Sequence, residues 1–235
     1  MNIVQERNWH SHEHRSRQKL NAVQKIFGAR MTKRDEKRQN LKARIIEATE
    51  RRIEESGVEA LRARDIMSDV GAALGGLYNV FADLDDLVLQ INSRTLARLK
   101  VELQTGAMPD GDPRAELTRL GLAYLRFVRT HPRLWSALFQ HPFAAGKPIP
   151  DWHRAEQGEL LSYLILALRP LQPELSEAAL ALRARTLFGA IHGIVETSLA
   201  ERFVGLSELD LEREIEAFIG LMVRGMRLEA PPRSG

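Results

Sequence analysis

The sequence predicts an all-α fold, and three observations lead to this prediction. Apolar residues recur every three or four positions through most of the chain, which is the period of an amphipathic helix. No stretch shows the strict apolar and polar alternation of a strand, and no internal repeat is present. Stretches rich in proline and glycine, at residues 106–113 and 142–150, separate the periodic segments. We therefore expect helices joined by short loops.

The composition is that of a globular protein. The chain has 235 residues, of which 44% are hydrophobic, so it is long enough for one large or two modest domains with a buried core. Because it has no cysteine, a disulfide framework, a thiolate nucleophile and a cysteine zinc site are excluded. We expect no apolar run long enough to span a membrane, and the N-terminus lacks the apolar core of a signal peptide. We expect a cytoplasmic protein without a membrane partner.

Positive charge is concentrated at the N-terminus. Residues 1–44 hold twelve Lys and Arg against four Asp and Glu, a balance of +8, whereas the rest of the chain carries −5. A basic head beside an acidic body is typical of a polyanion-binding protein with a separate second domain. Residues 1–37 are predicted to be a basic, flexible extension; for residues 1–30 alone, a solvated tail without a role is an equally good interpretation.

The segment 62–81 has the pattern of a helix-turn-helix. Ile66 and Val70 repeat at helical spacing before Gly71, and Leu77 and Phe81 do so after it, so these four apolar residues are expected to be core. Gly71 can take the positive φ that a tight corner between helices needs. The second helix is too short to be stable unless it packs on something.

The outer face of that second helix is predicted to carry little side chain. It would present Leu74, Gly75, Gly76 and Asn79, which is nearly bare backbone. A helix in the major groove of DNA needs such close approach, so we interpret the segment as a DNA-reading motif. The alternative is a corner between two helices inside an ordinary helical protein.

This segment resembles the DNA-binding segment of the TetR/AcrR family of bacterial transcriptional regulators. The resemblance lies in Gly71, in Gly75-x-Leu77-Tyr78-x-x-Phe81 and in Asp83-x-Asp85-x-Leu87, and it extends back to about residue 38. It implies a three-helix helix-turn-helix DNA-binding domain at residues 38–98 and a helical ligand-binding and dimerisation domain at 99–235. Arg62 and Ala73 depart from the family, which commonly has a Ser or Thr cap there.

The candidate DNA contacts comprise basic side chains and the outer face of the second helix, which carries little side chain. The basic residues suit phosphates, the tyrosine and asparagine suit phosphates or base edges, and the small residues allow close approach. The candidate DNA-binding residues are Lys42, Arg44, Arg62, Arg64, Ala73, Leu74, Gly75, Gly76, Tyr78 and Asn79.

Helix boundaries follow from periodicity, caps and proline positions. An apolar stripe predicts a helix that supports the motif, with Gly57 as its C-terminal cap, and Asp83 is a candidate N-cap for the helix after the motif. Besides the motif, the predicted helices are 37–56, 85–104, 113–130, 132–140, 151–168, 176–202 and 207–228.

Aromatic and imidazole side chains gather in the second domain. Apolar walls with a few polar groups are typical of a ligand cavity, and His192 in an apolar helix needs a polar partner. The candidate ligand-binding residues are Trp135, Phe139, Trp152, Tyr163, Phe188, His192 and Glu196. The alternative is an ordinary core with satisfied histidines.

No enzyme is expected. The sequence has no nucleophile elbow, phosphate loop or dinucleotide fingerprint, and no cofactor or metal is predicted. A metal-dependent hydrolase is a remote alternative, since only His192 and Glu196 have the spacing of paired metal ligands.

The sequence thus predicts a homodimeric transcriptional regulator, and we favour a repressor that a small molecule releases from a palindromic operator. A regulator without a small-molecule ligand is the alternative. The dimer is expected at segments 176–202 and 207–228, because their stripes exceed what packing on one neighbour needs. The stripes are Leu182, Leu187, Ile191, Val195 and Leu199, and Leu211, Ile215, Phe218, Ile219 and Met222.

Overall fold

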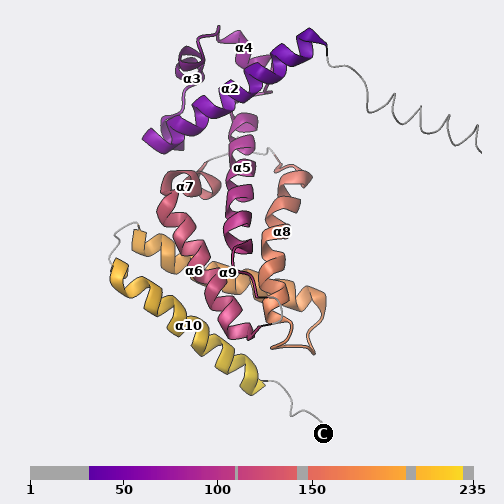
Figure 1. Ribbon diagram of the computed structural model, residues 1–235, viewed down its shortest axis with the longest axis vertical. Helices are drawn as coiled ribbons and strands as arrows, with labels where there is room; N and C mark the ends of the chain where they lie inside the picture. Colours follow the sequence, from indigo (N-terminus) through magenta and orange to yellow (C-terminus); the bar gives the residue numbers. More distant parts are fainter. Residues whose placement is uncertain (1–31, 109–110, 142–147, 200–204, 230–235) are drawn as a thin grey trace, which may run out of the picture. The chain divides into compact units, whose positions relative to one another are not determined.

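The structure is a computed structural model that describes residues 32–108, 111–141, 148–199 and 205–229. Within these residues the regular structure consists of helices, without a strand, so the predicted all-α class is confirmed (Figure 1). Two compact units, residues 1–44 and 45–235, make up the chain. The predicted extension lies outside the described residues as far as residue 31.

The helix that supports the motif, α2 (Lys33–Ser56), begins four residues before the predicted start. A reciprocal cap explains the earlier start: the Asp35 backbone N–H donates to Thr32 Oγ1 at 3.2 Å, and the Asp35 carboxylate accepts from the Thr32 hydroxyl at 2.7 Å. These hydrogen bonds lower the pKa of Asp35. Residues 33–37, predicted as extension, are therefore helical.

The motif has the predicted corner. α2 ends at Ser56 and is followed by Gly57, which has a positive φ of 81°, and η1 (Val58–Ala60) leads to α3 (Ala63–Val70) and α4 (Gly75–Tyr78). Gly71 ends α3 in the left-handed conformation, with φ 68° and ψ 40°, as its position predicted. The four predicted core residues of the motif are at most 4% exposed.

The second small helix is shorter than its apolar pattern indicated, because α4 has only four residues. Its first two residues are Gly75 and Gly76, which are poor helix formers, and its N-terminus has no side-chain cap. After α4 the backbone N–H groups of Val80 and Phe81 both donate to the Leu77 carbonyl, and the chain then turns toward the next helix.

The central helix is α5 (Leu84–Gln104), and Asp83 caps it as predicted by accepting from the Asp86 N–H at 2.8 Å. Around α5 pack α6 (Pro113–Thr130), α7 (Pro132–Gln140) and α8 (Asp151–Leu168), whose bounds agree with the prediction (Figure 1). Pro113 and Pro132 both stand in the first turn of their helices, where proline leaves no hydrogen bond unmade.

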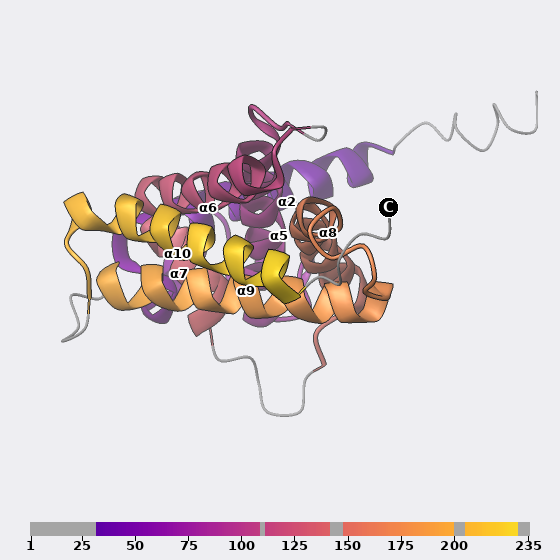
Figure 2. The same cartoon turned by 90° about the horizontal axis from the view of Figure 1, so that it is seen from below.

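The last two helices, α9 (Glu177–Leu199) and α10 (Glu208–Glu229), lie side by side (Figure 2). Residues 200–202 of the predicted segment lie outside the described residues. Six of the apolar stripe residues that we assigned to a dimer interface are buried in the core of the single chain. For these six residues, the prediction that they are left over for a dimer was wrong. These residues are Leu187, Ile191, Val195, Leu211, Ile215 and Ile219.

One further expectation needs correction. By length and composition, α9 could cross a membrane, whereas we expected no apolar run of this length from the sequence. Within the described residues it is the one helix of this kind, and it packs against α8 and α10 and buries Leu180, Ala184 and Leu187 in the core. Apolar core helices of water-soluble bundles have the same composition.

Candidate functional site

The outer face of α4 is exposed, as predicted. Ala73, Leu74, Gly75, Tyr78 and Asn79 are all exposed, with Leu74 at 40% and Tyr78 at 56%. Gly76 is half-buried. A Cβ atom built on Gly75 would have no atom within 4 Å, so none of the described residues covers this position.

The cations around the motif differ in their surroundings. Arg62 and Arg64 are exposed, but the Arg62 guanidinium also donates to the carbonyls of Glu59 at 3.1 Å and Leu61 at 2.8 Å. These bonds hold the chain before α3, whose start has no side-chain cap, and the sequence did not predict this role. Lys42 and Arg44 belong to the first unit, whereas the other eight DNA-binding candidates belong to the second.

An ion pair fixes α3 against α2. The Arg52 guanidinium donates twice to the Asp69 carboxylate, at 2.5 and 2.8 Å. This hydrogen bonding lowers the pKa of Asp69. The paired residues lie seventeen positions apart, so no local pattern predicted the pair. It holds the first small helix of the motif in a defined orientation.

Helices α5 to α10 enclose a cavity of about 400 Å³. Three of the candidate ligand-binding residues line it: Phe139, Tyr163 and Phe188. The other four do not. The rings of Trp135 and His192 lie next to that of Phe139, Glu196 is exposed, and Trp152 is 41% exposed with its ring against His153.

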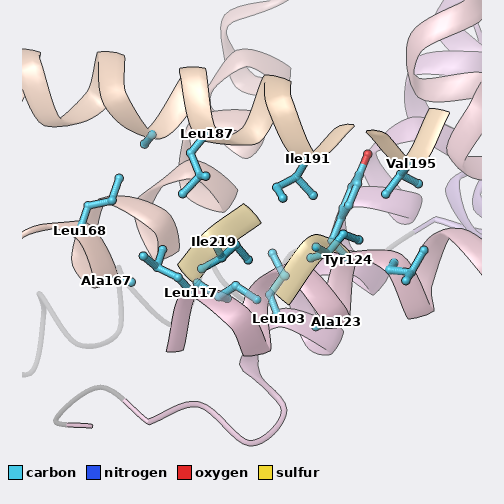
Figure 3. Packing of buried hydrophobic residues seen from close by; sticks show 14 of the residues in the cluster. Leu103, Leu117, Ala123, Tyr124, Ala167, Leu168, Leu187, Ile191, Val195 and Ile219 are labelled. Carbon is cyan, nitrogen blue, oxygen red and sulfur yellow. The ribbon is translucent and has the colours of Figure 1, made fainter. Parts of the chain in front are cut away.

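Tyr124 is a buried polar residue of the cavity wall that the predicted ligand-binding residues did not include. Its side chain rises from α6 with the hydroxyl directed toward α9, between Ile191 and Val195 (Figure 3). The Trp135 indole N–H donates to this hydroxyl at 2.7 Å, and His192 Nδ1 lies 2.8 Å from it. A buried tyrosine needs hydrogen-bond partners, and that requirement was the signal in the sequence.

The imidazole of His192 is enclosed by rings and remains neutral. Phe139 lies 4.3 Å and Phe188 5.6 Å from it, centroid to centroid. Burial lowers the pKa of His192, and the opposing effect of Glu196, whose carboxylate lies 3.8 Å from Nε2, is smaller. Burial also raises the pKa of Tyr124. Since the Tyr124 hydroxyl accepts from the Trp135 indole, its own proton is available to Nδ1 of His192.

A metal site finds no support in these residues. Among the residues that the structure describes, no group of three or more His, Asp or Glu side chains could hold a metal ion. His192 and Glu196 have no third ligand beside them, and the imidazole already has Tyr124 as its partner.

Helix α7 connects the cavity to the region of the motif. Leu138 and Phe139 line the cavity. At the start of α7, the Arg133 guanidinium donates to the carbonyls of Glu54, at 2.9 Å, and Glu55, in the last turn of α2. Just after α7, His141 Nε2 lies 2.9 Å from Asp85 in the first turn of α5. Both ends of the helix are thus tied to elements that flank the motif.

Comparisons with known proteins agree with this architecture. Residues 117–222 match the family model described as "Tetracyclin repressor-like, C-terminal domain". No curated protein matches the chain.

Solved structures share the fold at low sequence identity. A protein of unknown function from Rhodococcus sp. RHA1 has a TM-score of 0.64 and 18% identity over 79% of this chain and 94% of its own. A possible TetR family transcriptional regulator from Streptomyces coelicolor A3(2) has a TM-score of 0.57 and 17% identity, over 80% of this chain and 100% of its own. A TetR transcriptional regulator from Rhodococcus sp. RHA1 has a TM-score of 0.54 and 18% identity, over 78% of this chain and 96% of its own. Residues 117–222 thus resemble the C-terminal domain of tetracycline-type repressors, and the chain has the fold of the TetR transcriptional regulators named above.

Proposed function

We propose that the protein is a homodimeric, cytoplasmic repressor that binds a palindromic operator through α4 and is released from it by a small molecule. The observation that carries this proposal is the position of α7. The helix forms part of the cavity wall and is hydrogen-bonded at both ends to α2 and α5, the helices that flank the motif.

DNA binding is supported by the exposed, nearly side-chain-free face of α4. Leu74, Gly75 and Tyr78 lie open there, and no side chain of the chain fills the space at Gly75. Such a face can approach the floor of the major groove closely, while nearby arginines bind phosphates. We assign Arg64 to phosphate contact and Arg62 chiefly to holding the loop before α3.

Response to a ligand is supported by the connection through α7. A molecule that fills the cavity presses on Leu138 and Phe139, and any shift of α7 moves Arg133 and the two carbonyls of α2 that it binds. A ligand changes DNA affinity only if its own affinity differs between the two states, and the coupling is reciprocal. The ligand must therefore bind the DNA-competent state more weakly.

A dimer through α9 and α10 is supported by what these helices leave exposed. Leu182 on α9 is 64% exposed and Leu221 on α10 is 60% exposed. In the most apolar eighteen residues of α9, only 28% are buried. A Cβ atom at Gly189 or Gly193 would have nothing within 4 Å, so a second helix can approach closely there. Two symmetric motifs can read two half-sites of a palindrome.

A gel shift with the DNA upstream of the protein's own gene tests the proposal. We expect one specific complex that a tenfold excess of unrelated DNA does not remove and that a cavity-binding molecule releases. Absence of a specific complex would refute DNA reading by this chain. A complex that no cavity-binding molecule affects would favour the alternative, a regulator without a small-molecule ligand.

A further inference from the structure

The wall of the cavity restricts the body of the ligand to apolar groups. Of the nineteen lining residues, twelve are Leu or Ile, and Phe139 and Phe188 add two aromatic rings. An unpaired charge or a set of hydroxyl groups placed against these side chains would lose its hydration without replacement. A volume of about 400 Å³ admits a molecule of ordinary metabolite size.

The buried hydroxyl group of the wall, that of Tyr124, does not require a ligand partner. The Tyr124 hydroxyl accepts from Trp135 at 2.7 Å and contacts His192 Nδ1 at 2.8 Å. Since the indole N–H can only donate, the single hydroxyl proton is left for the imidazole. This end of the cavity is satisfied internally, so an apolar end of a ligand can lie against it without leaving a buried polar group unpaired.

The charge on the wall has one sign. Arg185 of α9 is the one charged residue among the nineteen, and none of them is acidic. Its side chain is exposed, and among the residues that the structure describes it has no ion-pair partner. A guanidinium offers two parallel N–H donors that match the two oxygens of a carboxylate. A cationic ligand would find no counter-charge on this wall.

On these observations, and resting on the proposed function, we propose that the ligand is an amphiphilic carboxylic acid whose aliphatic or aromatic body fills the cavity and whose carboxylate pairs with Arg185. The satisfied end at Tyr124 receives the tail. The exposed arginine keeps the charged group in contact with solvent, so binding does not require burial of an ion.

Three molecules with one chain and different head groups test the class of ligand. Decanoate, decanol and decylamine are titrated into the full-length protein by calorimetry, at equal pH and salt. We expect decanoate to bind about tenfold more tightly than decanol, as a hydrogen-bonded charge pair contributes, and decylamine to bind most weakly. Equal affinities, or a preference for decylamine, would overturn the proposal.

Two substitutions and a control assign the head group and the tail. Arg185→Gln should lower the affinity for decanoate to that for decanol, while Arg183→Gln, two residues earlier and outside the cavity wall, should leave it unchanged. Leu160→Trp, at a half-buried wall position, should weaken decanoate and decanol alike. Decanoate binding that neither Arg185→Gln nor Leu160→Trp reduces lies elsewhere and would refute the proposal.

These titrations contain no DNA, so they can fail separately from the proposed function. Operator release by a molecule that is neutral or cationic, with no decanoate binding, would refute the carboxylate class and leave ligand-responsive DNA binding intact. Decanoate binding that depends on Arg185, in a protein that binds no operator, would support the class of ligand while the proposed function fails.

Discussion

The reading face of α4 and the cavity of the second domain are built in opposite ways. The reading face, which is the exposed outer face of α4, comes from one stretch of seven residues, 73–79, and its centre has almost no side chain. The cavity takes nineteen residues from six helices and is lined with bulky leucines. An open, bare face suits a large, rigid partner, whereas an enclosed apolar wall suits a small molecule that gives up its water.

This difference implies two kinds of energetics. Binding at the reading face must depend on charge, because glycine and alanine contribute little contact and the phosphates of DNA are nearby. Binding in the cavity must depend on apolar burial, which salt does not screen. Measurements that change charge, symmetry, shape or coupling can therefore separate the two regions.

The largest expected effect is that of salt on DNA binding. With about six to ten phosphate contacts per dimer, operator affinity should fall by roughly three to five decades between about 50 and 200 mM salt. The affinity for an uncharged cavity ligand such as decanol should stay nearly constant over this range. Fluorescence anisotropy of labelled operator and calorimetry measure the two dependences, and a flat operator curve would contradict DNA binding through this surface.

The next effect is loss of the dimer. Leu182→Glu combined with Leu221→Glu should give a folded monomer in light scattering at micromolar concentration, because both positions are exposed. Operator affinity should drop by roughly two to four decades, the contribution of linking two half-site interactions. Phe218 and Met222, two residues of the stripe predicted from the sequence, are less suitable because both pack on the core.

A matched double variant controls for added charge. Val101 and Leu166 are 62% and 64% exposed, and they lie on α5 and α8. Glutamate at these two positions should leave the dimer intact. If this variant dissociates instead, or if the Leu182 and Leu221 variant stays dimeric, the interface does not lie on α9 and α10.

A smaller effect is expected from Gly75→Glu on the reading face. A Cβ atom at this exposed position has no described atom within 4 Å, so the fold should lose at most about 1 kcal/mol. Against DNA, steric exclusion and repulsion by phosphates should reduce specific affinity roughly a hundredfold. Gly158→Glu, on the exposed surface of α8 and equally free of contacts, should bind operator normally. Normal operator binding by a folded Gly75→Glu protein would exclude α4 as the reading element.

The two regions also differ in how much of them the sequence predicts. The motif is a local pattern: Gly71 at its corner and the buried Ile66 and Leu77 lie within twelve residues of one another, so spacing alone predicted them. Helix bounds at Pro113, Pro132 and Asp151 were predicted because proline and its caps act locally.

The residues of the cavity wall are brought together by long-range packing, which local patterns in one sequence do not predict. Tyr124 and His192 are 68 residues apart, and only the fold brings them to hydrogen-bond distance. For the same reason, the ligand prediction chose aromatic residues and passed over most of the leucines that form the wall. Arg133 was missed because its partners are carbonyl groups, which leave no trace in residue type.

Coupling between the two regions should weaken when Arg133 is removed. Arg133→Ala deletes the donor to the last carbonyls of α2 and should destabilise the fold by about 1 kcal/mol. Ligand affinity should be unchanged, since Arg133 does not line the cavity, while the factor by which the ligand weakens operator binding should fall by roughly threefold to thirtyfold. Arg169→Ala, which removes only a surface ion pair with Glu177, serves as the control. Full ligand response in Arg133→Ala would mean that α7 does not transmit the signal through this contact.

The smallest expected effect is the pH dependence that His192 gives to stability. Burial holds its pKa in the folded protein below the value of 6.5 expected in the unfolded chain. Above that pH both states are neutral and the residue adds no pH dependence. As pH falls through 6.5, His192 becomes protonated in the unfolded chain but stays neutral in the folded protein. The free energy of unfolding therefore decreases until the pH reaches the pKa of His192 in the folded protein. The chain has six other histidines, so the informative quantity is the difference between the wild type and His192→Gln, whose side-chain amide can still accept from Tyr124. Urea unfolding between pH 8 and about 5 should show a shallower loss of stability in the variant. Parallel curves would show that His192 is not the buried, neutral partner of Tyr124 that the geometry indicates.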